Sequence, residues 1–350
     1  MLTTVGVHAP LLSGLVSVSA SSERNVEETA EGPNTDGVAY AIHVEGLTKV
    51  YPGPVTAVDH LDMAVRAGEI FGLLGPNGAG KTTTVGMLTT RIVPTAGTAR
   101  VGGVDVVADP ARGREACGVV SQGNTLDRGL SVRDNLYFHG RYFGMGRGEA
   151  RAAADRWLET FQLSHRAKAH VGALSGGMAR RLMVARAVLH GPRVLFLDEP
   201  TAGLDPQSRL GLWDAVTEMH AAGQTVLLTT HYMEEADQFC DRVAIMDHGH
   251  ILALDTPKNL KAAPAQGASI TLKGSGETAR LERLVQRIDG VTLAAPADGT
   301  LRVHVSAPDG ALPRVIATAD RCGFTLADVS VEQPTLETVF IELTGRALRE

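Results

Sequence analysis

The chain has 350 residues, of which 44% are hydrophobic and 21% charged, and its formal net charge is −6. This length accommodates two domains, and the composition is that of an ordinary globular protein. The mildly acidic balance argues against nucleic acid as a main partner, because phosphate backbones attract basic surfaces. The three cysteines, Cys117, Cys240 and Cys322, are widely separated and odd in number, which favours reduced thiols over disulfides or structural zinc.

Residues 1–38 are rich in Ser, Thr and Gly and then acidic, a composition typical of a disordered, mobile extension. The uncharged stretch 1–22 contains a proline and many polar residues, so it lacks the ~20 consecutive apolar residues of a spanning helix. The first Lys or Arg of the chain is Arg24, whereas a signal peptide begins with positive charge. If the chain serves a membrane, we expect another chain to supply the membrane part.

Residues 39–264 have a mixed α/β pattern, in which short apolar runs alternate with longer amphipathic stretches. Strands are expected at 70–74, 194–197 and 226–230, and helices at 151–160 and 178–189. Because residues 132–190 are mostly helical in pattern, the sequence predicts a helical subdomain at about 126–190 inserted into an α/β domain.

From residue 265 the pattern changes to a small α+β module. Strands are expected at 270–273, 291–294, 301–306 and 326–331, and helices at 277–288, 312–322 and 336–343. Asp298-Gly299 marks a hairpin between the second and third strands. The order β-α-β-β-α-β is the ferredoxin-like arrangement, which predicts an accessory module over 265–350.

A glycine-rich segment after the first expected strand fits the phosphate-loop pattern GxxxxGK[ST]. It reads Gly75-Pro76-Asn77-Gly78-Ala79-Gly80-Lys81-Thr82. Glycines allow successive backbone N–H groups to ring a phosphate, and the helix that starts near Thr83 directs its positive end at the same anion. Lys81 is expected to reach the β- and γ-phosphates, and the Thr82 hydroxyl to ligate Mg²⁺. This motif alone indicates an NTPase without selecting among the classes.

The strand at 194–197 ends in two carboxylates, Asp198 and Glu199. Adjacent strand residues face opposite sides of the sheet, so Asp198 can help to bind Mg²⁺ while Glu199 contacts the attacking water. Glu199 is therefore the candidate general base.

A second phosphate-binding helix end is predicted at Leu174-Ser175-Gly176-Gly177-Met178. Ser175 suits the N-cap position, and the two glycines let a phosphate approach the helix start. A second such end is redundant for one nucleotide, unless it caps the γ-phosphate held by another copy of the chain.

With these motifs in this order, residues 40–260 resemble the ABC ATPase family, a P-loop NTPase fold. Further matches are Tyr51 to the aromatic that stacks on adenine, Gln122 to the Q-loop glutamine, Ala202-Gly203-Leu204-Asp205 to the D-loop and His231 to the switch histidine. The resemblance implies that His231 holds the γ-phosphate and orients the water. It also implies that Gln122 contacts Mg²⁺ or that water, and that Thr83 reaches the α-phosphate.

The family's usual fifth signature residue is Gln, and here it is Met178. This departure resembles the drug- and polyketide-exporter ATPases of the daunorubicin-resistance type, as do the D-loop, residues 231–237 and the tail 334–345. The resemblance implies ATP hydrolysis in a head-to-tail homodimer, on the cytoplasmic side of the cell membrane, with a separately encoded permease. In that dimer Ser175, Gly176 and Gly177 act in trans, and residues 126–143 are the expected docking surface. An importer ATPase and a soluble non-transport ABC protein are the alternatives.

Overall fold

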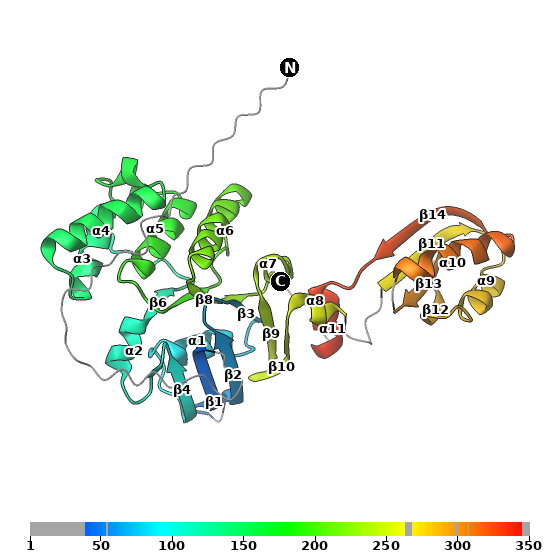
Figure 1. Ribbon diagram of the computed structural model, residues 1–350, viewed down its shortest axis with the longest axis horizontal. Helices are drawn as coiled ribbons and strands as arrows, with labels where there is room; N and C mark the ends of the chain where they lie inside the picture. Colours follow the sequence, from blue (N-terminus) through cyan, green and yellow to red (C-terminus); the bar gives the residue numbers. More distant parts are fainter. Residues whose placement is uncertain (1–38, 54, 263–267, 298–299, 307, 345–350) are drawn as a thin grey trace, which may run out of the picture. The chain divides into compact units, whose positions relative to one another are not determined.

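The computed structural model describes residues 39–344, apart from residues 54, 263–267, 298–299 and 307. The predicted extension over residues 1–38 lies outside the described residues. The chain forms two compact units. Of the described residues, the first unit holds those up to Tyr232 together with Phe239–Leu252, and the second holds Met233–Gln238 together with those from Ala253 onward. Figure 1 labels the elements.

A six-stranded sheet has the order β10-β9-β3-β8-β7-β6, and all of it except the last three residues of β10 belongs to the first unit. Its strands are β3 (Ile70–Leu74), β6 (Cys117–Val120), β7 (Val194–Asp198), β8 (Thr225–Thr230), β9 (Arg242–Asp247) and β10 (His250–Asp255). The pairs from β9 across to β6 are parallel. Every residue of β3, β7 and β8 is buried, which explains the apolar runs at their centres and confirms the strands expected there. Because these strands are parallel, their carboxyl ends meet at one edge of the sheet.

A second, antiparallel sheet of the first unit has the order β2-β1-β4-β5. Its strands are β1 (Tyr40–Tyr51), β2 (Val55–Arg66), β4 (Ala96–Val101) and β5 (Val104–Asp105). These strands are absent from the sequence-based expectations. Register shifts interrupt the pairing of β1 with β2 at several points, so the apolar alternation that marks a strand is broken.

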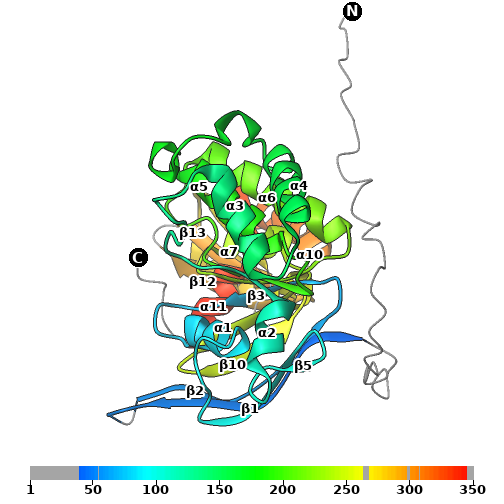
Figure 2. The ribbon, with the colours of Figure 1, turned by 90° about the vertical axis from the view of Figure 1, so that its left-hand side faces the viewer.

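Helices cover the rest of the first unit. They are α1 (Lys81–Leu88), α2 (Pro110–Ala116), α3 (Val132–Tyr142), α4 (Arg147–Thr160), α5 (Gly176–Val188) and α6 (Pro206–Ala221), with short 3-10 turns at Ser164–Arg166 and Val171–Ala173. Helices α4 and α5 confirm the expectations at 151–160 and 178–189. Figures 1 and 2 both show α3, α4 and α5 gathered on one side of this unit, with β1 and β2 on the opposite side.

The second unit contains a four-stranded antiparallel sheet in the order β12-β13-β11-β14. Its elements are α7 (Met233–Phe239), α8 (Pro257–Lys261), β11 (Ala268–Ser275), α9 (Thr278–Val285), β12 (Val291–Ala297), β13 (Thr300–Val305), α10 (Pro308–Arg321), β14 (Thr325–Glu332) and α11 (Leu336–Thr344). Apolar residues of α9 and α10, such as Leu281 and Val315, pack with Ile270 and Val303 of the sheet. The expected turn at residues 298–299 lies outside the described part. Across the described ranges, no helix has the length and hydropathy needed to span a bilayer.

Candidate active site

The glycine-rich loop lies between β3 and α1, with Lys81 as the first residue of α1. Gly80 has φ of 105°, and a Cβ there would lie 2.4 Å from the Ala57 carbonyl oxygen, so only glycine fits. Lys81 Nζ donates to the carbonyl oxygens of Gly75, at 2.7 Å, and Pro76, at 3.1 Å. Burial lowers the pKa of Lys81, while the carboxylates of Glu199 and Asp198 oppose that shift. The loop thus holds a buried ammonium group against its own carbonyl oxygens, within the segment that the sequence predicts to bind phosphate.

Three oxygen-bearing side chains meet at the end of β7. Asp198 is 4% exposed, and its Oδ1 atom lies 3.4 Å from Thr82 Oγ1. Thr229 Oγ1, on β8, donates to the same carboxylate oxygen at 2.7 Å. A hydroxyl from α1 and a carboxylate from β7 therefore face one another. These are hard oxygen donors of the type that Mg²⁺ prefers, so the residues fit the predicted ion.

Glu199 lies just beyond β7, with a left-handed φ of 46°. The sequence predicts that Asp198 and Glu199 alternate along one strand, and this prediction is wrong for Glu199. The strand ends at Asp198, and the left-handed backbone of Glu199 sets the direction of its side chain. This conformation costs about 1–3 kcal/mol for a residue with a Cβ and needs support from its surroundings. Part of that support comes from Thr229, whose carbonyl and hydroxyl oxygens accept from the Glu199 N–H at 3.1 and 3.0 Å.

The carboxylate of Glu199 joins two more predicted residues. Gln122, just after β6, donates from Nε2 to Glu199 Oε2 at 2.9 Å. His231, just after β8, places Nδ1 3.4 Å from Glu199 Oε1. The structure thus brings together side chains that follow three adjacent strands, because the carboxyl ends of those strands share one edge of the sheet.

Two predicted binding elements stand apart from this cluster. The ring of Tyr51 contacts Lys49, whose Nζ lies 5.1 Å from the ring centroid, and within the described part of the chain no hydrogen bond, ion pair or ring contact joins Tyr51 to the cluster. Ser175 caps α5, since its Oγ accepts from the Met178 N–H at 3.2 Å.

The two signature glycines differ in their surroundings. Gly176 is exposed, and a Cβ there would meet open space. Gly177 is buried, and a Cβ there would lie 2.2 Å from Ser208 Oγ on α6. Packing of α5 against α6 thus supplies a reason for a glycine at position 177, in addition to the predicted approach of a phosphate.

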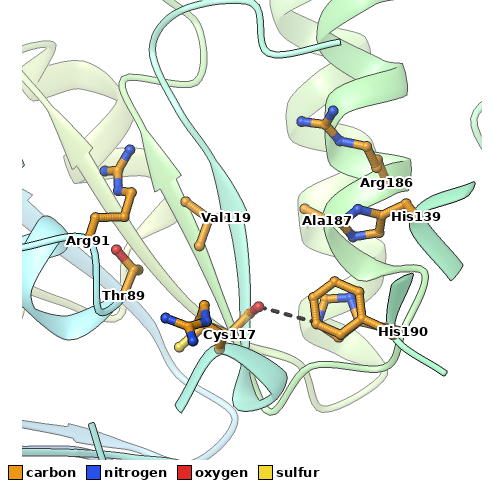
Figure 3. Close-up of a pocket in the computed structure, with 10 residues that line it drawn as sticks. Thr89, Arg91, Cys117, Val119, His139, Arg186, Ala187 and His190 are labelled. Carbon is orange, nitrogen blue, oxygen red and sulfur yellow. Dashed lines mark hydrogen bonds between the residues drawn. The ribbon is translucent and has the colours of Figure 1, made fainter. Parts of the chain in front are cut away.

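A cavity of about 200 Å³ lies near the other end of α1, and the sequence-based predictions did not include it. Thr89, which ends α1, lines it, whereas the glycine-rich loop precedes that helix. Figure 3 shows side chains from α1, β6, α3 and α5 around the cavity. The lining residues are Thr89, Arg91, Arg114, Cys117, Val119, His139, Phe143, Arg186, Ala187 and His190.

Three arginines of this cavity have only neutral hydrogen-bond partners. Arg91 donates to Ser121 Oγ, Arg114 to Thr90 Oγ1, and Arg186 to the carbonyl and hydroxyl oxygens of Thr125. No carboxylate within the described ranges pairs with these three guanidinium groups. The cavity is therefore positively charged.

Two half-buried histidines in the same cavity have lowered pKa values, which favour the neutral form at pH 7. Burial lowers the pKa of His139 to about 3, with Arg186 and His190 adding to the shift, and lowers the pKa of His190 to about 4. The ring of His190 stacks on Phe143 at a centroid distance of 3.9 Å and contacts the Cys117 carbonyl oxygen at 3.2 Å. Burial also raises the pKa of the Cys117 thiol to about 12, so that thiol stays protonated.

These lowered pKa values predict that acid destabilises the first unit. Below the unfolded-state histidine pKa of about 6.5, His139 binds a proton in the unfolded chain but not in the folded one. The free energy of unfolding therefore falls as the pH decreases toward 4. His139→Phe is expected to reduce this pH dependence by up to about 1.4 kcal/mol per pH unit. Urea unfolding at several pH values measures the effect. His165→Phe, at an exposed position, is the control, and equal slopes for the two variants would contradict the prediction.

Comparisons with known proteins identify the family. Residues 58–202 match the ABC transporter family. The daunorubicin/doxorubicin resistance ATP-binding protein DrrA of Streptomyces peucetius is 41% identical over 87% of this chain and 92% of its own length. The linearmycin resistance ATP-binding protein LnrL of Bacillus subtilis is 35% identical over 88% of this chain and 100% of its own length. The solved structure of cbiO1 from Clostridium perfringens, part of the ABC transporter complex cbiONQ, has a TM-score of 0.60 and 28% identity. It covers 64% of this chain and 92% of cbiO1.

The fold and the cluster at the sheet edge define a P-loop ATPase of the ATP-binding cassette class. The chain belongs to the ABC transporter ATP-binding family, and within it to the drug-exporter type. It is an ATP hydrolase, as the sequence predicts.

Proposed function

We propose that the chain powers export of a drug-like, lipid or polyketide-type substrate through a separate membrane subunit. The observation that carries this proposal is the cluster of Gln122, Glu199 and His231 beside Asp198 and the loop lysine, in a chain similar to resistance ATPases over most of its length. A relative named for export of Nod factors, at 38% identity, also supports export. The chain would then act as a peripheral subunit at the membrane surface.

The roles of the residues follow from their placement. The backbone of residues 75–83 would ring the phosphates, Lys81 would neutralise the β- and γ-phosphates, and Tyr51 would stack on adenine. Thr82 and Asp198 would hold Mg²⁺, with Gln122 as a further ligand, and the ion supplies charge neutralisation on the phosphate oxygens.

Glu199 would then accept the proton of the attacking water. Its carboxylate is already aligned by Gln122 Nε2 at 2.9 Å, and His231 lies 3.4 Å away. His231 would orient the same water and hold the γ-phosphate. Holding the water in line with the phosphorus is the main catalytic demand, because the chemistry of phosphoryl transfer depends on positioning and charge stabilisation.

We propose that two copies associate head to tail around ATP. Ser175 and Gly176 are exposed at the start of α5, where Ser175 Oγ caps only the Met178 N–H and an anion can approach the helix N-terminus. Nothing in the described part of the same chain joins this helix end to the glycine-rich loop. The γ-phosphate held by one copy would complete the site on the other, and its hydrolysis would loosen the pair.

The membrane subunit would dock on residues 126–143, beside the arginine-lined cavity. Phe138 and Tyr142 are 52% and 80% exposed on α3, one helical turn apart, so they form an apolar stripe open to a partner. On the neighbouring stripe, His139 and Phe143 line the cavity. A partner segment that carries apolar residues and a carboxylate would match both features.

The docking proposal predicts that Arg114→Glu lowers recovery of the membrane subunit by about 10-fold or more, since a like-charge contact replaces an attractive one. Arg112→Glu is the matched control, because Arg112 is exposed on the same helix but does not line the cavity. The measurement is co-purification of membrane protein with the tagged chain, alongside ATPase activity without membranes. Equal recovery with the two variants would remove the cavity from the docking surface.

For the remaining parts of the chain we propose the predicted architecture. Helices α3 to α5 would form the helical subdomain. The second unit would be a ferredoxin-like module, supported by its β-α-β-β-α-β order and its antiparallel sheet order β12-β13-β11-β14. Such a module would support the dimer or the coupling to the permease.

A further inference from the structure

Arg180, on α5, lies behind the catalytic cluster and has no part in the roles proposed so far. It is 6% exposed. Its guanidinium group donates to the carbonyl oxygens of Pro200 and Glu199, and on another side to those of Ser121, at 2.6 Å, and Gln122, at 3.5 Å. One side chain therefore holds the segments that follow β6 and β7.

We infer that Arg180 is a positioning residue, which sets the backbone of Glu199 and Gln122 so that their side chains meet at the attacking water. This inference rests on the proposed roles of those two residues. Arg180 itself does not touch the reacting atoms, because its hydrogen bonds all go to main-chain oxygens.

The backbone of Glu199 needs such a restraint. Its φ of 46° lies in the left-handed region, which a residue with a Cβ leaves unless contacts hold it. Thr229 accepts from the N–H of this residue, and its carbonyl oxygen accepts from Arg180 and, at 3.3 Å, from the Ala202 N–H. Without Arg180, the Glu199 carbonyl oxygen keeps only the Ala202 N–H as a donor, and the backbone that directs the carboxylate toward Gln122 is less restrained.

Burial of the Arg180 guanidinium group without an ion pair lowers stability, and its role in positioning Glu199 and Gln122 explains why an arginine stands there. A buried guanidinium group is usually paired with a carboxylate, yet across the described residues Arg180 forms no ion pair. Burial accordingly lowers its pKa, although Asp198 and Glu199 oppose the shift at longer range. The planar fork of arginine can serve carbonyl oxygens on two segments at once, which a lysine ammonium group cannot do with the same geometry.

Arg180 lies on α5, the helix that Ser175 caps, so it connects the proposed binding site for the other copy's nucleotide with Glu199. Ser175, the N-cap of this helix, is the residue proposed to receive the nucleotide of the other copy, and Arg180 follows about one and a half turns later. A shift of α5 on arrival of that nucleotide would move the guanidinium group, and with it the carbonyl of Glu199.

The test is a double-mutant cycle in the full chain, measured as single-turnover ATP hydrolysis. Arg180→Met is expected to lower the hydrolysis rate by about 10–100-fold with ATP affinity changed less than about 3-fold, because misplacement by an ångström has effects of this size. In a Glu199→Gln background the same substitution is expected to change the residual rate by less than about 2-fold, since the group that it positions is already lost.

Two further variants separate positioning from folding. Arg181→Met, on the same helix, removes an arginine whose Nη1 donates to the Phe161 carbonyl, and it should leave the rate within about 2-fold. Arg180→Lys keeps the charge, so if Arg180→Met fails to fold, the cycle is run with the lysine variant, for which an intermediate loss is expected. Thermal unfolding and ATP titration establish that each variant is folded.

The outcomes are distinguishable. Equal losses from the Arg180 substitution in both backgrounds, or no loss in either, would overturn the inference while leaving the role of Glu199 intact. Near-normal turnover by Glu199→Gln alone would instead overturn the proposed role of Glu199, and the inference with it.

Discussion

Glu199→Gln should bind ATP with unchanged affinity and hydrolyse it at least about 100-fold more slowly, because positioned general bases contribute roughly 10²–10⁴-fold. Glutamine has the shape of glutamate and can still accept from Gln122 Nε2, which lies 2.9 Å from the carboxylate. The substitution therefore removes the capacity to take up a proton while leaving the local contacts largely in place. Phosphate release under saturating ATP measures the effect.

The same variant should also accumulate as an ATP-bound dimer, since the shared γ-phosphate is no longer cleaved. Size-exclusion chromatography with and without ATP reports the dimer. Glu218→Gln, at an exposed position on α6, is the control and should hydrolyse ATP normally. If Glu199→Gln stays monomeric with ATP at high protein concentration, the head-to-tail arrangement is wrong. If it keeps normal turnover, another group is the base.

Lys81→Ala should weaken ATP binding by about 10–100-fold, the loss expected when a hydrogen-bonded charge contact of about 1.5–3 kcal/mol is removed. Lys81 Nζ is buried between the loop carbonyls and the carboxylates of Asp198 and Glu199. Without its positive charge, an arriving phosphate would face those two carboxylates uncompensated. Hydrolysis should fall with occupancy and also at saturating ATP.

Isothermal titration with ATP measures this loss, and thermal unfolding shows whether the variant is folded. Lys258→Ala, an exposed lysine of the second unit, is the control for general loss of positive charge. ATP affinity equal to that of the unaltered chain would show that the loop does not cradle the phosphates as proposed. The two variants thus separate binding from chemistry: Glu199→Gln should keep ATP, and Lys81→Ala should lose it.

Much of the candidate site could be predicted from the sequence, because its parts are local. The glycine-rich loop requires a strand, a tight turn and a helix in direct succession, and β3 and α1 supply them. The buried strands β7 and β8 have apolar centres, 194–197 and 226–228, and the charged or ionisable residues that follow these strands, Glu199 and His231, stand out against them. Local patterns of this kind predict structure correctly, because each depends on a few neighbouring residues.

Only the tertiary structure decided the features that depend on residues far apart in the chain. The antiparallel strands β1 and β2 escaped prediction, because bulges break their alternation. The left-handed turn at Glu199 is stabilised by Thr229 and Arg180, which local sequence does not connect to it. The arginine-lined cavity likewise joins side chains from separate helices and strands. Sequence by itself determined which groups can do the chemistry, and the packing of distant segments determined where those groups point, since side-chain direction is set by long-range contacts.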